Sequence, residues 1–89
     1  MPIVIVPEAY RGPTRGLGEI EVEGGTVREC IAAVEVRHPG FGELCLTADG
    51  EAHRFVKLFL NEEQLMGDVL DQKLGANDRL EVLAAIAGG

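Results

Sequence analysis

The most chemically suggestive residues of the sequence are its last two, Gly88 and Gly89, which follow Ile86 and Ala87. A glycine pair has no side chains and wide backbone freedom, so it can enter a narrow channel in an extended conformation. A carboxylate carried at the end of such a tail can reach the active site of another protein. There, ATP can convert it to an acyl-adenylate that a sulfur nucleophile attacks. The alternative interpretation is a frayed end, where almost any residue is tolerated.

Other candidate groups give weaker signals. Cys30 and Cys45 fit neither a disulfide framework nor a zinc-binding spacing, and Cys30 is expected to be a small core residue. His38 and His53 are expected at the surface or its boundary, with His53 beside Arg54 forming at most a weak anion site. The sequence therefore predicts no catalytic residue and no metal site of its own.

Length and charge narrow the classes of function. The chain has 89 residues, and 8 basic against 15 acidic side chains give a net charge of −7. A chain of this size has room for one modest core but not for a deep active-site cleft as well. The acidic balance argues against binding nucleic acid or an anionic membrane, both of which need clustered Lys and Arg. Without an apolar run of about 20 residues or a signal peptide, a cytoplasmic location is the default expectation.

The pattern of apolar residues predicts strands at 3–6, 17–23, 53–60 and 79–84, with a short strand within 64–70. Thr26 and Glu29 form a capping box at the start of a helix that ends near Arg37, and residues 41–52 are expected to be irregular. The first and last strands are the most apolar and should form a parallel central pair. This predicts an α+β, β-grasp (ubiquitin-like) domain at 1–84, with a mixed four- to five-stranded sheet and one main helix on one face, followed by a flexible tail at 85–89.

One face of this sheet is expected to carry no helix. Leu83 would lie on it two residues after Glu81, with Phe55 and Phe59 on the neighbouring strand and Val4 and Val6 on the first. An exposed apolar patch of this kind often marks a partner site on a small protein. We therefore predict that the patch binds partner proteins and that the tail leaves from its edge. The alternative is that the 41–52 segment folds over part of it.

Two segments of the sequence resemble a known family. The stretch HRFVKLFLNEE (53–63) and the end NDRLEVLAAIAGG (77–89) are similar to the third strand and to the last strand and tail of the ubiquitin-like sulfur carrier proteins. That superfamily includes the molybdopterin-synthase small subunit and the thiamin sulfur carrier. The resemblance is strongest to the sulfur carriers of cysteine biosynthesis.

The resemblance implies a function as a carrier and not as an enzyme. Gly89 would be adenylated by a ubiquitin-activating-type adenylyltransferase and converted to a thiocarboxylate, which a sulfur-accepting synthase then uses. ATP would be used by the activating enzyme, and the carrier would hold no permanent cofactor. Three alternatives remain open: a small subunit of molybdopterin synthase, a protein modifier conjugated through Gly89, and a binding module with an incidental tail.

Overall fold

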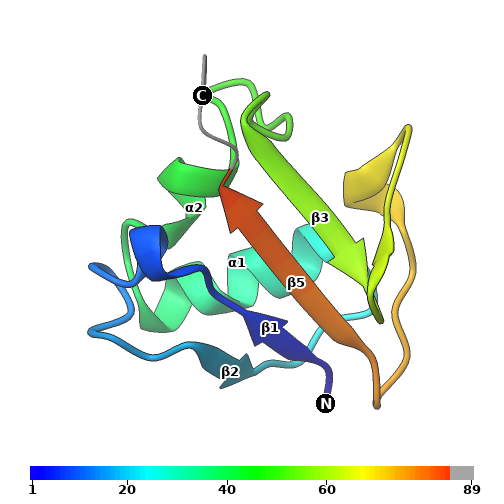
Figure 1. The fold of residues 1–89 in the computed structure, drawn as a ribbon, viewed down its shortest axis with the longest axis horizontal. Helices are drawn as coiled ribbons and strands as arrows, with labels where there is room; N and C mark the ends of the chain where they lie inside the picture. The colour runs from blue at the N-terminus through cyan, green and yellow to red at the C-terminus, as the bar shows by residue number, and fades with distance from the viewer. Residues whose placement is uncertain (85–89) are drawn as a thin grey trace.

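The computed structural model of the protein describes residues 1–84, which form one five-stranded sheet covered on one face by a helix (Figure 1). The order of strands is β2-β1-β5-β3-β4. Their bounds are β1 Ile3–Ile5, β2 Glu19–Glu21, β3 Val56–Leu60, β4 Glu63–Gln64 and β5 Arg79–Ala84. β1 and β5 are parallel, and the other neighbouring pairs are antiparallel. The predicted α+β class and the parallel pairing of the first and last strands are confirmed.

Helix α1 (Val27–Arg37) crosses the sheet and begins where the capping box predicts. The backbone N–H of Glu29 donates to Thr26 Oγ1 at 3.2 Å. The Glu29 carboxylate does not return to Thr26, but accepts from the N–H of Gly25 at 2.7 Å. Both bonds satisfy amide groups at the start of the helix, which have no partner within the helix itself.

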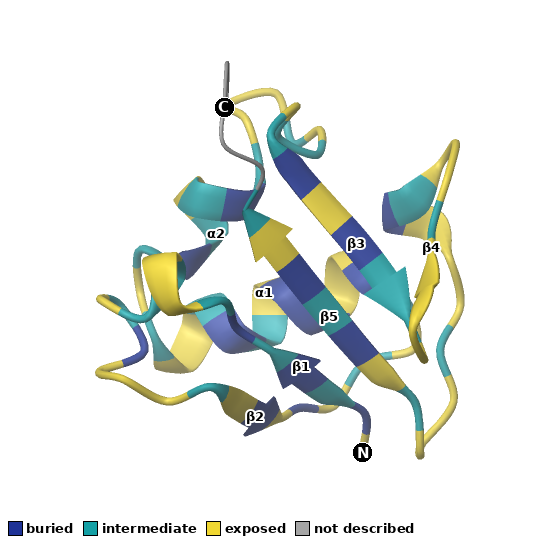
Figure 2. Cartoon of the chain, viewed as in Figure 1, coloured by how far each residue is buried: buried dark blue, intermediate teal, exposed yellow. Residues whose placement is uncertain are grey.

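The core lies between α1 and the inner face of the sheet. Figure 2 shows the alternation of buried and exposed residues along β5, where Leu80 and Val82 are fully buried. The helix contributes a stripe at the spacing of one helical face. Its buried residues are Val27, Cys30, Ile31 and Val34. Burial of this stripe fixes which side of the helix packs against the sheet.

A second helix, α2 (Phe41–Cys45), lies where the sequence predicts irregular structure. It packs against α1, with Phe41 and Cys45 buried in the same core. Its first amides are capped from a distance: the Glu35 carboxylate accepts from the N–H of Gly40 at 3.1 Å and of Gly42 at 2.8 Å. Five residues are too few to show a helical period, which explains why the pattern did not predict it.

The expectation that Val4 and Val6 face outward is wrong. Both are fully buried, and Val4 pairs with buried Leu80 in the parallel ladder. Residues 3–6 are all β-branched and apolar, so this segment has no polar–apolar alternation to show which face is buried. The structure places Ile3 and Ile5 on the outer face instead, where they are half-buried.

The predicted strand position of Phe55 is also wrong. β3 begins at Val56, three residues later than predicted, and Phe55 lies half-buried in the preceding turn. The Phe55 N–H donates to His53 Nδ1 at 3.3 Å. The downstream part of the prediction holds, because Val56 and Leu58 are buried while Lys57 is exposed.

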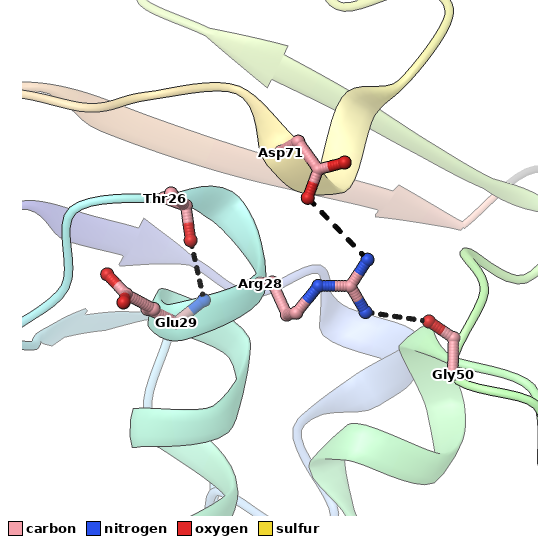
Figure 3. A network of polar contacts seen from close by, with 5 residues as sticks. All are labelled: Thr26, Arg28, Glu29, Gly50 and Asp71. Atoms are coloured by element: carbon pink, nitrogen blue, oxygen red, sulfur yellow. Dashed lines mark hydrogen bonds and ion pairs between the residues drawn. The ribbon is translucent and has the colours of Figure 1, made fainter.

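A polar network joins the start of α1 to two loops (Figure 3). Arg28 donates to the carbonyl oxygen of Gly50 at 3.0 Å and forms an ion pair with Asp71 at 3.7 Å. Asp71 ends the short helical turn η2 (Val69–Asp71). Both charged side chains are largely exposed, so the network contributes little to stability and mainly positions the loops.

The turn between β3 and β4 leads to a stability prediction. Asn61 and Glu62 both have positive φ, 50° and 73°, as a two-residue type I′ hairpin turn requires. Glycine adopts this conformation without strain, whereas glutamate does not. We expect Glu62→Gly to raise the free energy of unfolding by up to about 1 kcal/mol in urea denaturation. The matched control is Glu63→Gly in β4, which should lower it because glycine weakens a strand.

Candidate functional site

The candidate site is the helix-free face of the sheet at the end where β5 finishes. Leu83 is 38% exposed there and pairs with Lys57 of β3. Phe59 follows on the same face, half-buried, and pairs with Glu81. The prediction that Leu83 and Phe59 face outward is confirmed, while their role in binding a partner stays a prediction.

Two further apolar residues complete this face. Ile5 pairs with Glu81 on the other side of β5. Leu17, which is 50% exposed, lies just before β2, where the carbonyl oxygen of Gly18 accepts from Val6 N–H at 2.9 Å. Leu17 was missed, although alternation from Glu19 already placed it on the outer face. We call Leu17, Leu83, Phe59 and Ile5 together the apolar face.

The alternative in which the 41–52 segment covers this face is not realised by α2. Phe41 and Cys45 direct α2 into the core on the α1 side of the sheet. Leu83 retains its exposure at the tip of β5 (Figure 2). Among residues 1–84, α2 therefore leaves Leu83 accessible at the tip of β5.

The tail is rooted at this end of the sheet. Ala84, the last described residue, pairs with Val56 at the start of β3. The predicted tail at 85–89, with Ile86, Ala87, Gly88 and Gly89, lies outside the described residues. Its attachment point nonetheless follows directly from Leu83, so the root of the tail adjoins the apolar face.

A small hollow opens farther along the sheet, toward the turn between β3 and β4. Its volume is about 270 Å³, and it is lined by Ile5, Asn61, Glu62, Arg79 and Glu81. It falls below the usual size of clefts for small ligands. Over residues 1–84 no three His, Cys, Asp or Glu side chains come together in a way that could hold a metal ion.

The two cysteines lie in the core and away from this surface. Burial raises the pKa of the Cys45 thiol to about 12. Burial, helped by the charge of nearby Glu29, raises the pKa of Cys30 to about 11. Because the thiolate is the reactive form, neither group is suited to carry sulfur.

This burial predicts slow thiol chemistry in the folded protein. At pH 8, Cys30 and Cys45 should react with a chromogenic disulfide reagent at least about 100-fold more slowly than in urea, since unfolded thiols titrate near 8.5. Equal rates in folded and unfolded protein would contradict the prediction.

The same burial predicts a pH dependence of stability. The pKa values of both thiols are raised in the folded state, so the free energy of unfolding should fall as the pH rises from about 9 toward 11.

In the part of the chain that is described, no helix is both long enough and apolar enough to cross a bilayer. The helices there are α1, with 11 residues, and α2, with five, besides short helical turns. A membrane span requires about 20 residues.

Comparison with known proteins gives the same family by sequence and by structure. The chain is 28% identical to the sulfur carrier protein CysO of Mycobacterium tuberculosis, over 97% of this chain and 96% of that one. The crystal structure of CysO from the same species superposes with a TM-score of 0.88 at 25% identity, covering 97% of this chain and 100% of the other. A chain in the crystal structure of an Amycolatopsis orientalis BexX/CysO complex gives 0.88 at 33% identity, covering all of both chains.

The family assignment extends over most of the sequence. Residues 10–89 match the ThiS family. The match takes in α1, β3, β5 and the two final glycines. The described architecture is also that of the β-grasp, ubiquitin-like sulfur carriers among its structural relatives. The chain belongs to the ThiS family.

Proposed function

We propose that this protein is a sulfur carrier whose Gly89 carboxylate is adenylated, converted to a thiocarboxylate and used by an enzyme that makes cysteine or a related sulfur metabolite. The observation that carries the proposal is the Gly88-Gly89 end, which lies within the ThiS match at residues 10–89. The name of its relative, sulfur carrier protein CysO, agrees with it.

The chemistry is performed on the tail by partner enzymes. A ubiquitin-activating-type adenylyltransferase joins the Gly89 carboxylate to AMP from ATP and releases pyrophosphate. A sulfur nucleophile then attacks the acyl carbon, and AMP leaves as the thiocarboxylate forms. After a synthase has taken the sulfur, an oxygen from water restores the carboxylate. ATP is bound by the activating enzyme, so the carrier needs no cofactor, and the dependence on ATP suits a cytoplasmic protein.

The position of the apolar face supports the docking step of this proposal. Leu83 and the rest of the apolar face adjoin Ala84, where the tail begins. A partner that covers Leu83 is therefore well placed to receive the tail. The Amycolatopsis relative, solved as a BexX/CysO complex, supports the idea that such carriers assemble with another protein.

The test is the intact mass of the protein purified from its native host. We expect a fraction heavier by one oxygen-to-sulfur exchange, located at Gly89 by fragmentation. A variant lacking Gly89 should never acquire this mass and serves as the matched control. Adducts on target lysines without the sulfur form would point to a protein modifier, and a tight hetero-oligomer would point to a molybdopterin-synthase subunit. Either result would overturn the proposal.

A further inference from the structure

Two cations, Arg54 and Lys57, lie near the end of β5 and have no carboxylate partner among residues 1–84. Four of the eight basic residues donate side-chain hydrogen bonds within residues 1–84; these are Arg11, Arg28, Arg37 and Arg79. Arg54 and Lys57 donate none and form no ion pair with any described residue. The chain has 15 acidic side chains, yet none in the described part pairs with Arg54 or Lys57. Both cations are therefore available to an external anion.

Both cations lie at the root of the tail. Lys57 pairs with Leu83, and Val56 pairs with Ala84. Because β3 runs antiparallel to β5, the chain two residues before Val56, at Arg54, lies beyond the end of β5. Figure 1 shows the start of β3 beside the tip of β5. The positive charges therefore flank the point where the described chain stops at Ala84.

The exposed Arg54 guanidinium contacts an aromatic ring of its own chain. Its central carbon lies 4.9 Å from the centroid of the Phe55 ring, a distance at which cation and ring attract each other. The centroid of the Phe55 ring in turn lies 5.6 Å from that of the His53 ring, and the backbone N–H of Phe55 donates to His53 Nδ1. A side chain ordered in this way loses less entropy when it binds.

Acidic residues occupy other parts of the same face. Glu19 and Glu21 lie on the edge strand β2. Glu81 lies on β5 two residues before Leu83, and therefore farther from the tail. Arg79, the other cation of this face, is already paired with Glu19 at 3.2 Å. The sheet thus offers a basic rim at the tail root and acidic groups away from it, a pattern that fits one orientation of a partner.

Resting on the proposed function, we propose that Arg54 and Lys57 bind carboxylates at the mouth of the channel through which the activating enzyme receives the tail. A bound adenylate phosphate is the other anion to consider. A five-residue segment that enters a narrow channel in an extended conformation would span up to about 17 Å, which would place its terminal carboxylate beyond the reach of either side chain. Protein carboxylates at the channel entrance are therefore the occupant that the geometry favours.

The experiment measures ATP–pyrophosphate exchange with the adenylyltransferase of the same organism as the probe. Arg54→Glu and Lys57→Glu should each raise the KM for the carrier about tenfold and leave kcat within about twofold, since charge reversal at a rim acts mainly on encounter. Added salt should raise the KM of the wild type, because it screens attraction, and lower that of the variant carrying both substitutions, because it screens repulsion. The matched control is Lys73→Glu, which changes the net charge equally at a residue that bridges to Thr26 beside the start of α1.

The outcomes separate this inference from the proposed function. If the wild type supports exchange but the Arg54 and Lys57 variants keep their KM, or match the Lys73 control, the inference is overturned and the carrier function stands. A fall in kcat with unchanged KM would indicate contact with the adenylate, which also overturns it. If the wild type supports no exchange, both proposals fail. Thermal melts that match the wild type ensure that each variant is folded.

Discussion

Leu83→Glu should weaken binding of the activating enzyme about 30-fold, because a central apolar contact of an interface is worth about 2 kcal/mol. Leu83 is 38% exposed at the tip of β5 and directly precedes Ala84. A glutamate there places a charge where a partner must exclude water. The fold should survive, since the substituted side chain already contacts solvent. Titration calorimetry with the activating enzyme measures the change in affinity.

The chain offers a matched control for this variant. Val36 on α1 is 80% exposed, on the other side of the sheet from the apolar face. Val36→Glu adds the same charge at an equally apolar position, so it should leave affinity unchanged. The docking surface would be assigned wrongly if both variants bound like the wild type, or if both weakened binding equally.

Phe41→Ala should lower the free energy of unfolding by about 3–5 kcal/mol, the usual loss for a fully buried phenylalanine. Phe41 is fully buried and anchors α2 to the core. The polar cap from Glu35 to Gly40 and Gly42 fixes only the entry to this short helix. For a domain of this size the loss corresponds to a fall in Tm of roughly 20 °C, which differential scanning calorimetry can measure.

The comparison variant is Phe59→Ala, which makes the same truncation at a half-buried position of β3. It should cost clearly less stability, because part of the ring already contacts water. Equal losses from the two variants would mean that α2 is not part of the cooperative core.

The sequence was most informative where one pattern had one structural meaning. Thr26 and Glu29 indicate the start of α1, and both this start and the predicted end near Arg37 are confirmed by the structure. Strict alternation placed Leu80 and Val82 inward and Leu83 outward. In each case local geometry and burial imposed the same requirement on the residue types.

Prediction failed where residues of one kind filled both faces of an element. Val4 is buried because the register with β5 places it beside Leu80, and no residue within 3–6 carries that information. Phe55 is assigned to the strand by extending its alternation backwards, whereas it lies in the turn that directly precedes β3. The role proposed for Gly89 depends on chemistry that other proteins would perform, which no pattern of burial in this domain can reveal.

The position of β5 has a consequence for synthesis of the chain. β5 hydrogen-bonds to β1 on one side and to β3 on the other, so the middle of the sheet joins the first and last described segments. On the ribosome, the N-terminal strand must wait for residues 79–84 before its parallel partner exists, and contacts so distant in sequence form late. A truncated nascent chain would thus lack both the surface around Leu83 and the tail. Activating enzymes that read this surface would thereby act only on chains whose translation and folding are complete.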